Sequence, residues 1–244
     1  MRVAANSNKT AAEIRAILTS RGSAEHAKGV QWFFKEDIQS RGWHTAALRA
    51  FARERRREIL KEHALEFLVK VADLLFTGRV LEEKIFAILL LEDLTSKMDN
   101  RHFLLFESWL NRISTWADHD GLVHYLIAPM IAADRKRLPR VFEWGKSPDR
   151  WHRRAACVAL IQGRQQREYF AQTCRLANSL VHDQDEMVQK GLGWLLRVTA
   201  KATPGKTVPY LLKIRARAPR LVLRTACETL SPSQKRLVLA KQVQ

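Results

Sequence analysis

The sequence repeats a pattern every 34 to 36 residues, and this internal repeat limits the possible folds more than any other feature. In each copy a charged residue stands early in a predicted helix, with an apolar residue two positions later. These charged positions, called the repeat ladder below, are Arg49, Lys84, Asp120, Arg154, Lys190 and Arg224. A leucine follows six positions after each of the last five. A two-helix repeat of this length is typical of HEAT-like solenoids, in which neighbouring helix pairs stack to bury their apolar faces.

The rest of the sequence also favours helices. Glycine and proline are sparse, at 10 and 7 residues, and apolar residues recur at three- and four-residue spacing with no useful strand alternation. We therefore predict an all-α, HEAT-like helical-repeat solenoid, an α-α superhelix with a basic concave groove lined by the second helix of each pair. Residues 1–9 are predicted to form a flexible tail, and residues 10–244 a single domain.

The composition indicates a polyanionic partner. Lysine and arginine number 42 against 25 acidic residues, and this gives a formal net charge of +17 that is spread along the chain. That spread favours nucleic acid over an anionic membrane surface. The longest apolar run, 85–91, is too short to span a membrane, and no secretory signal is evident, so we expect an intracellular protein without a membrane partner.

Neither the cysteines nor the histidines show metal-binding spacing. Cys157, Cys174 and Cys227 are isolated, and we expect them to be small buried residues. The eight histidines do not cluster as ligands either, and His119 is predicted to lie at the surface. We predict neither a metal nor a cofactor.

One acid interrupts the otherwise basic ladder. Contacting helices lie about 8–10 Å apart, so the ladder positions should form a line across one surface, where the cations would suit phosphates. Asp120 would repel phosphate, and it therefore needs another role. Trp116 stands four residues before it, and Trp194 stands four residues after Lys190. A carboxylate flanked by two indoles suits a sugar that develops positive charge.

Simpler interpretations exist for the same residues. An aspartate at the start of a helix is ordinarily an N-cap, and Asp118 is a better candidate than Asp120 for the cap or helix-start acid. Trp116 and Trp194 could both be core residues, as tryptophans of helical proteins usually are.

Three stretches resemble the bacterial AlkD-like DNA glycosylases, alkylpurine repair enzymes built from HEAT-like repeats. Trp116-Ala117-Asp118-His119-Asp120 is similar to the family's Trp-x-x-x-Asp element, which supplies the catalytic acid and an aromatic residue. The segment 151–156 places Arg154 at the family's backbone-contacting arginine. The segment 188–197 matches the part with the second catalytic tryptophan and a further arginine, here Trp194 and Arg197. The family also has a tyrosine on an early helix, and the corresponding stretch here, 27–34, has none.

The resemblance implies hydrolysis of the N-glycosidic bond of cationic N3- or N7-alkylated purines in duplex DNA, without base flipping, metal or cofactor. The expected catalytic residues are Asp120, Trp116 and Trp194. The expected DNA-binding residues, from the resemblance and the ladder together, are Arg154, Lys190, Arg197, Lys84 and Arg224. We expect a monomer in the bacterial cytoplasm, acting on double-stranded DNA. The alternatives are a non-catalytic basic scaffold for nucleic acid or an acidic protein, and a family member that binds distorted DNA without cutting it.

Overall fold

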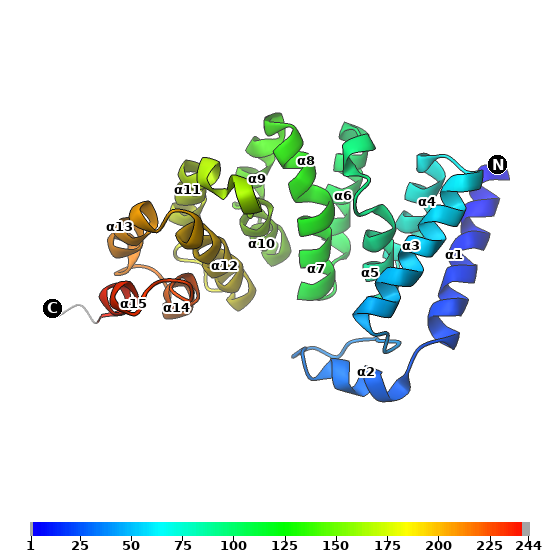
Figure 1. Ribbon diagram of the computed structural model, residues 1–244, viewed down its shortest axis with the longest axis horizontal. Helices are drawn as coiled ribbons and strands as arrows, with labels where there is room; N and C mark the ends of the chain where they lie inside the picture. Colours follow the sequence, from blue (N-terminus) through cyan, green and yellow to red (C-terminus); the bar gives the residue numbers. More distant parts are fainter. Residues whose placement is uncertain (1, 241–244) are drawn as a thin grey trace. The chain divides into compact units, whose positions relative to one another are not determined.

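The computed structural model describes residues 2–240, which form an all-helical fold, as the periodicity predicted. The chain divides into two compact units, Met1–Leu126 and Ile127–Gln244. The helices of the first unit are α1 (Arg2–Ser20), α2 (Ala24–Gln31), α3 (Thr45–Glu62), α4 (Leu65–Phe76), α5 (Leu81–Leu91), α6 (Asn100–Trp109) and α7 (Trp116–Leu122) (Figure 1). Those of the second unit are α8 (Ala128–Ala133), α9 (Leu138–Trp144), α10 (Arg150–Ala159), α11 (Phe170–Leu180), α12 (Glu186–Ala202), α13 (Pro204–Ile214), α14 (Arg220–Ala226) and α15 (Pro232–Leu239).

Short helical turns join several of these helices. The 3-10 turns are Thr95–Lys97, Leu110–Arg112, Arg135–Arg137 and Gly163–Tyr169, and a π-helical turn follows α7 at Val123–Ile127. Between residues 2 and 240 the structure contains no β-strand, and a single isolated bridge pairs Gln39 with Val80. Over the same range no helix combines the length and the apolar character needed to cross a membrane.

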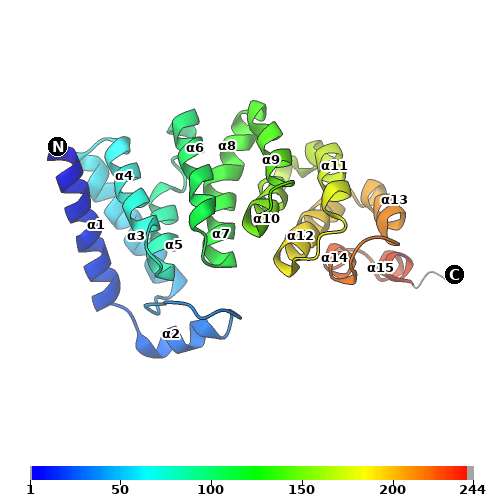
Figure 2. The ribbon, with the colours of Figure 1, turned by 180° about the vertical axis from the view of Figure 1, so that it is seen from behind.

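Alternate helices pack side by side in each unit, as a two-helix repeat predicts. In the first unit α3 contacts α5, and α5 contacts α7. In the second unit α10 contacts α12, and α12 contacts α14 (Figure 2). These are the helices that contain the repeat ladder. The intervening helices pack beside them, α4 against α5, α9 against α10, and both α11 and α13 against α12.

The apolar residues of the repeat form the core of each unit. The residues two positions after the last five ladder positions are all fully buried, namely Phe86, Leu122, Ala156, Leu192 and Ala226. The leucines six positions after the ladder are fully buried as well at Leu90, Leu126, Leu160 and Leu196, and half-buried at Leu230. Burial of a leucine side chain stabilises a fold by about 1.5–3 kcal/mol, so each buried leucine of the repeat contributes to the stability of its unit.

The first helix extends further toward the N-terminus than the sequence predicted. It begins at Arg2, so residues 2–9 are helical where a flexible tail was expected. Ser7 is fully buried, and so are Ala11 and Ile14, at the spacing of one helix face. α1 packs against α4 along its length. The small polar Ser7 continues the apolar stripe, and this was not evident from the polar composition of the segment.

A buried carboxylate fixes the segment that joins α2 to α3. Glu82, only 3% exposed, accepts hydrogen bonds from Ser40 Oγ (2.7 Å) and from the backbone N–H groups of Arg41 (2.7 Å) and Gly42 (2.9 Å). Gly42 has φ +71°, and a Cβ there would lie 2.0 Å from the carbonyl oxygen of Ser23. Only glycine fits this position.

We therefore expect Gly42→Ala to lower the free energy of unfolding by at least about 1–3 kcal/mol, because it adds left-handed strain to a backbone clash. Gly29→Ala is the matched control, since a Cβ at Gly29 meets no atom within 4 Å in α2 and should be neutral or stabilising. Urea unfolding of both variants measures the difference. A Gly42→Ala midpoint equal to that of the wild type would contradict the described loop.

Candidate functional site

The start of α7 is fixed by a reciprocal capping box. The side-chain oxygen of Thr115 accepts hydrogen bonds from the N–H groups of Ala117 (3.2 Å) and Asp118 (3.4 Å). Asp118, fully buried, accepts in return from the N–H groups of Thr115 (2.7 Å) and Ser114 (2.9 Å). This arrangement satisfies donors that a helix start leaves unpaired. Asp118 is therefore the helix-start acid, as the sequence predicted.

The side chain of Lys84 points into the interior of the first unit. Nζ lies 3.2 Å from Oδ2 of Asp118, and only 3% of the side chain is exposed. Nζ also donates to Ser114 Oγ (2.6 Å) and to the carbonyl oxygen of Arg112. A buried carboxylate requires a compensating charge, and Lys84 provides it. This cation therefore pairs α5 with the start of α7, and contact of Lys84 with DNA stays a prediction.

Asp120 lies within α7, not before it, so the alternative that it is an N-cap is wrong. Its side chain is 18% exposed, and Oδ1 lies 2.7 Å from Nδ1 of His119. His119 is fully buried, so the prediction that it lies at the surface is wrong. A buried imidazole in contact with the carboxylate restricts its rotamers. Asp120 is thus a partly accessible carboxylate whose orientation is restricted by His119.

Trp116 is the first residue of α7 and lies at the surface. The residue is 36% exposed, so the alternative that it belongs to the core is wrong. The indole stacks on the ring of Phe34, with ring centroids 5.2 Å apart and 20° between the ring planes. Stacking on Phe34 holds the indole in one orientation one turn before Asp120 on α7.

Arg154 is nearly buried in the second unit. Only 6% of the residue is exposed, and Nη1 donates to the carbonyl oxygen of Met187 at 2.6 Å. Gly191 allows this close approach, since a Cβ there would lie 3.2 Å from Cγ of Arg154. The guanidinium therefore joins α10 to α12. That Arg154 contacts the DNA backbone stays a prediction.

The remaining predicted residues of the second unit are accessible. Lys190 is 42% exposed at its side chain and pairs with Glu186 at 2.8 Å. Arg197, 33% exposed, pairs with Glu228 after α14. Trp194 is half-buried on α12, and Arg224 is exposed on α14. Partly exposed ion pairs of this kind stabilise a fold by only about 0–1 kcal/mol, so the two paired cations can change partners at small cost.

The predicted residues are divided between the two units. The first unit contains Trp116 and Asp120, and the second contains Trp194 with the accessible cations Lys190, Arg197 and Arg224. Each set is described within its own unit, and the convergence of Trp194 on Asp120 stays a prediction. The basic ladder positions of the first unit are both paired with acids, since Arg49 contacts Glu92 at 2.7 Å and Lys84 contacts Asp118.

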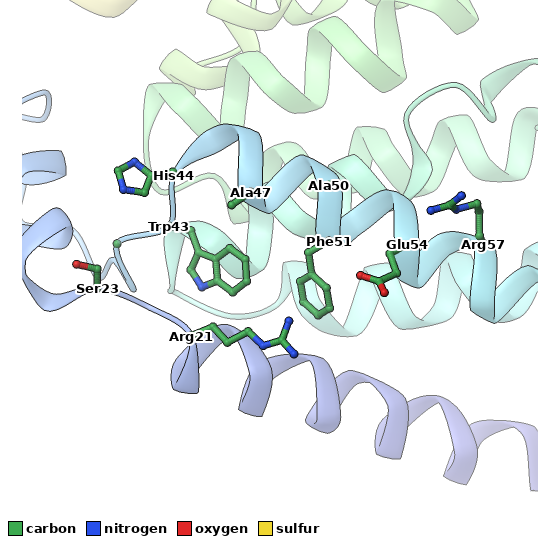
Figure 3. A pocket seen from close by; sticks show the side chains of 10 residues that line it. Arg21, Ser23, Trp43, His44, Ala47, Ala50, Phe51, Glu54 and Arg57 are labelled. Carbon is green, nitrogen blue, oxygen red and sulfur yellow. The ribbon is translucent and has the colours of Figure 1, made fainter.

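Of two pockets in the first unit, one lies at the start of α7. A pocket of about 560 Å³ between α1 and α3, shown in Figure 3, is lined by Arg21, Ser23, Gly42, Trp43, His44, Ala47, Ala50, Phe51, Glu54 and Arg57. It contains none of the predicted site residues. A smaller polar pocket of about 310 Å³ is lined by Asp37, Ile38, Gln39, Arg79, Leu81, Lys84, Ser114, Thr115 and Asp118. This second pocket borders the start of α7, where its lining residues Thr115 and Asp118 flank Trp116 in the sequence.

The acidic residues, histidines and cysteines of the described chain form no group of three or more that could hold a metal ion. Cys157 and Cys227 are buried, as predicted, while Cys174 is half-buried. Burial raises the pKa of the Cys157 thiol to about 12, so that thiol stays protonated at neutral pH.

Two features of the candidate site could not be predicted from the sequence, the contact of Phe34 with Trp116 and the burial of His119. His119 lies beside Asp120 in the sequence, but its burial depends on how α7 packs. Phe34 belongs to a run of three aromatic residues, 32–34, and that run was the available signal. A contact across some eighty residues of chain has no local signature.

Comparison with known proteins identifies a family for this chain and solved structures with a similar fold. A family model described as DNA alkylation repair enzyme matches residues 14–230. A predicted DNA alkylation repair enzyme from Enterococcus faecalis is similar in structure, with a TM-score of 0.76, 17% identity, and 86% of this chain and 97% of that chain covered. AlkD2 from Streptococcus mutans has a TM-score of 0.54 and 24% identity, with 74% of this chain and 89% of that chain covered. No curated protein matches the chain.

We expect Lys84→Ala to destabilise the protein by about 3–5 kcal/mol, because it leaves the buried carboxylate of Asp118 without its counter-charge. Arg224→Ala is the control from the same ladder, and its exposed side chain should change the free energy of unfolding by less than about 0.5 kcal/mol. Urea unfolding measures both. Equal stability of the two variants would contradict the assignment of Lys84 to the interior.

Proposed function

Because this chain belongs to the DNA alkylation repair enzyme family, whose model matches residues 14–230, we propose that it is a DNA glycosylase. The proposed reaction is hydrolysis of the N-glycosidic bond of cationic N3- or N7-alkylated purines in duplex DNA. The observation that carries the proposal is Asp120, a partly exposed carboxylate on α7 with its rotamer restricted by a buried histidine. A carboxylate in this setting suits a substrate that becomes positively charged.

The chemistry needs little beyond charge stabilisation. The bond between the sugar C1′ and the alkylated base breaks with its electron pair going to the base, which leaves as a neutral molecule. The deoxyribose then carries oxocarbenium character, and a water molecule adds its oxygen to C1′ and releases a proton. Opposite unit charges about 4 Å apart gain roughly 4 kcal/mol at an effective dielectric of 20. That gain corresponds to about three orders of magnitude in rate.

We assign Asp120 to stabilise the sugar cation and to orient the attacking water. The role of Trp116 is to offer its ring face to the polarised C–H groups of the same deoxyribose, since it is exposed and held by Phe34. Trp194 would pack on the sugar from the second unit. An exposed indole also supports recognition at the protein surface without flipping the base into a pocket.

The phosphate contacts of this proposal lie on α12 and α14. Lys190, Arg197 and Arg224 are accessible there, and each neutralised phosphate releases bound counterions. The proposed partner is therefore double-stranded DNA that contains alkylated purines. We further propose that the protein acts as a monomer in the cytoplasm, where bacterial chromosomal DNA is located.

We expect Asp120→Asn to lower the release of 7-methylguanine from methylated duplex DNA by at least about a hundredfold under single-turnover conditions, because the carboxylate charge is lost. Chromatography of the free base measures the rate. Asp93→Asn is the matched control, since Asp93 is a 78% exposed carboxylate of the same unit and should retain the wild-type rate. Wild-type protein that releases no more base than buffer alone would contradict the enzymatic proposal and favour a family member that binds without cutting.

Replacement of Lys190 or Arg224 with alanine should weaken DNA binding and reduce the slope of log affinity against log salt by about one each. Lys70→Ala is the control, because Lys70 is an exposed lysine of α4 outside the ladder. Fluorescence anisotropy at several salt concentrations gives the slopes. Slopes unchanged in both ladder variants would contradict the assigned phosphate contacts.

A further inference from the structure

The segment after α2 exposes two large aromatic side chains. Trp32 is 91% exposed and Phe33 is 75% exposed, more than any other large apolar residue of the described chain. α2 itself has no buried residue. Figure 1 shows α2 and the segment after it below the lower ends of α1 and α3, apart from the stacked helices. We call Trp32 and Phe33 the aromatic tip. Apolar area exposed to this degree is unfavourable in water and indicates a contact surface.

The aromatic tip is held by its neighbours in a defined position. The side-chain amide of Gln31 donates to the carbonyl oxygen of Glu36 (2.8 Å), and its oxygen accepts from the N–H of Ile38 (3.1 Å). Phe34 stacks on Trp116, which ties the segment to the start of α7. The carboxylate of Glu82 secures the other end of the segment at residues 40–42. The two exposed rings therefore stand on a preorganised loop.

The charge of this segment favours contact with bases over contact with phosphates. Residues 24–44 contain three basic residues, Lys28, Lys35 and Arg41, and three acidic residues, Glu25, Glu36 and Asp37. Their charges cancel, in a chain whose net charge is +17. Neutral, apolar rings do not attract a phosphate backbone, whereas every nucleobase has a π-face on which an aromatic ring can stack.

The aromatic tip is continuous with the candidate site. Phe34 directly follows it in the chain and packs on Trp116, the indole assigned to the deoxyribose. We propose that Trp32 and Phe33 stack against an unpaired nucleobase where the duplex is distorted, so that this protein recognises disrupted base pairing through the tip. This inference rests on the proposed function, because it needs the DNA at the start of α7. Unstacking a base costs least where pairing is already weakened, and the tip would therefore discriminate in favour of damaged sites.

The test compares two fluorescein-labelled duplexes of one sequence, intact or with a single tetrahydrofuran abasic site that leaves the opposite base unpaired. Fluorescence anisotropy gives the affinity of each duplex for wild-type protein and for the Trp32→Ala/Phe33→Ala double variant. We expect the wild type to prefer the abasic duplex and the double variant to lose at least about tenfold of that preference. Affinity for the intact duplex should stay within about twofold, since the rings do not contact phosphates.

Leu104→Ala is the matched control, because Leu104 is a 50% exposed apolar residue on α6 of the same unit and should leave both affinities unchanged. Urea unfolding checks the fold of each variant, and removal of side chains this exposed should change stability by less than about 0.5 kcal/mol. A second measurement uses a duplex with the fluorescent base 2-aminopurine opposite the abasic site. Its fluorescence should be quenched by wild-type protein and not by the double variant.

Several results would overturn this inference. They are a wild type that does not prefer the abasic duplex, a double variant that retains the preference, and equal loss of affinity for both duplexes. A double variant that changes only the elution volume in gel filtration, or only binding to phosphatidylcholine vesicles, would assign the tip to a second copy or to lipid instead. Failure of the proposed function looks different, because wild-type protein would then bind neither duplex or would release no alkylated base.

Discussion

Nζ of Lys84 lies 3.2 Å from the carboxylate of Asp118, and neither side chain is more than 3% exposed. Each charge would be costly to bury alone, so this pair, together with the capping box of Thr115, defines where α7 begins. Trp116 lies before Asp118 on that helix and Asp120 lies after it. The accessible indole and the accessible carboxylate thus depend on a pair of buried charges that does no chemistry itself.

The helical repeat gives equivalent positions different roles. Lys84 and Arg154 occupy the ladder yet point into the interior, where a carboxylate and a backbone carbonyl satisfy them. Lys190 on α12 and Arg224 on α14 occupy equivalent ladder positions, and both side chains remain accessible. A ladder position lies at the edge of the buried face, so the neighbouring groups decide which way a long cationic side chain turns. The proposed DNA contacts therefore depend on which groups surround the cationic side chain in each repeat.

The repeat explains why much of this fold was predictable. Period and apolar spacing are local properties of the sequence, and they correctly predicted an all-helical repeat fold and buried residues such as Phe86 and Leu192. Asp118 was recognisable as a helix-start acid for the same reason. The exposure of Trp32, the burial of His119 and the stack of Phe34 on Trp116 were not predictable, because each depends on packing between distant segments. An aromatic residue in a helical protein is usually expected in the core. The sequence alone therefore does not show which aromatic residue is exposed.

The central claim is that Asp120 stabilises positive charge on the sugar. The most direct measurement compares binding of two duplexes, one with a cationic pyrrolidine abasic analogue and one with the neutral tetrahydrofuran analogue, to wild-type protein and to Asp120→Asn. We expect wild-type protein to bind the cationic duplex at least about tenfold more tightly, and Asp120→Asn to lose this preference. Equal affinity of wild-type protein for the two analogues, or a preference that Asp120→Asn retains, would contradict the central claim.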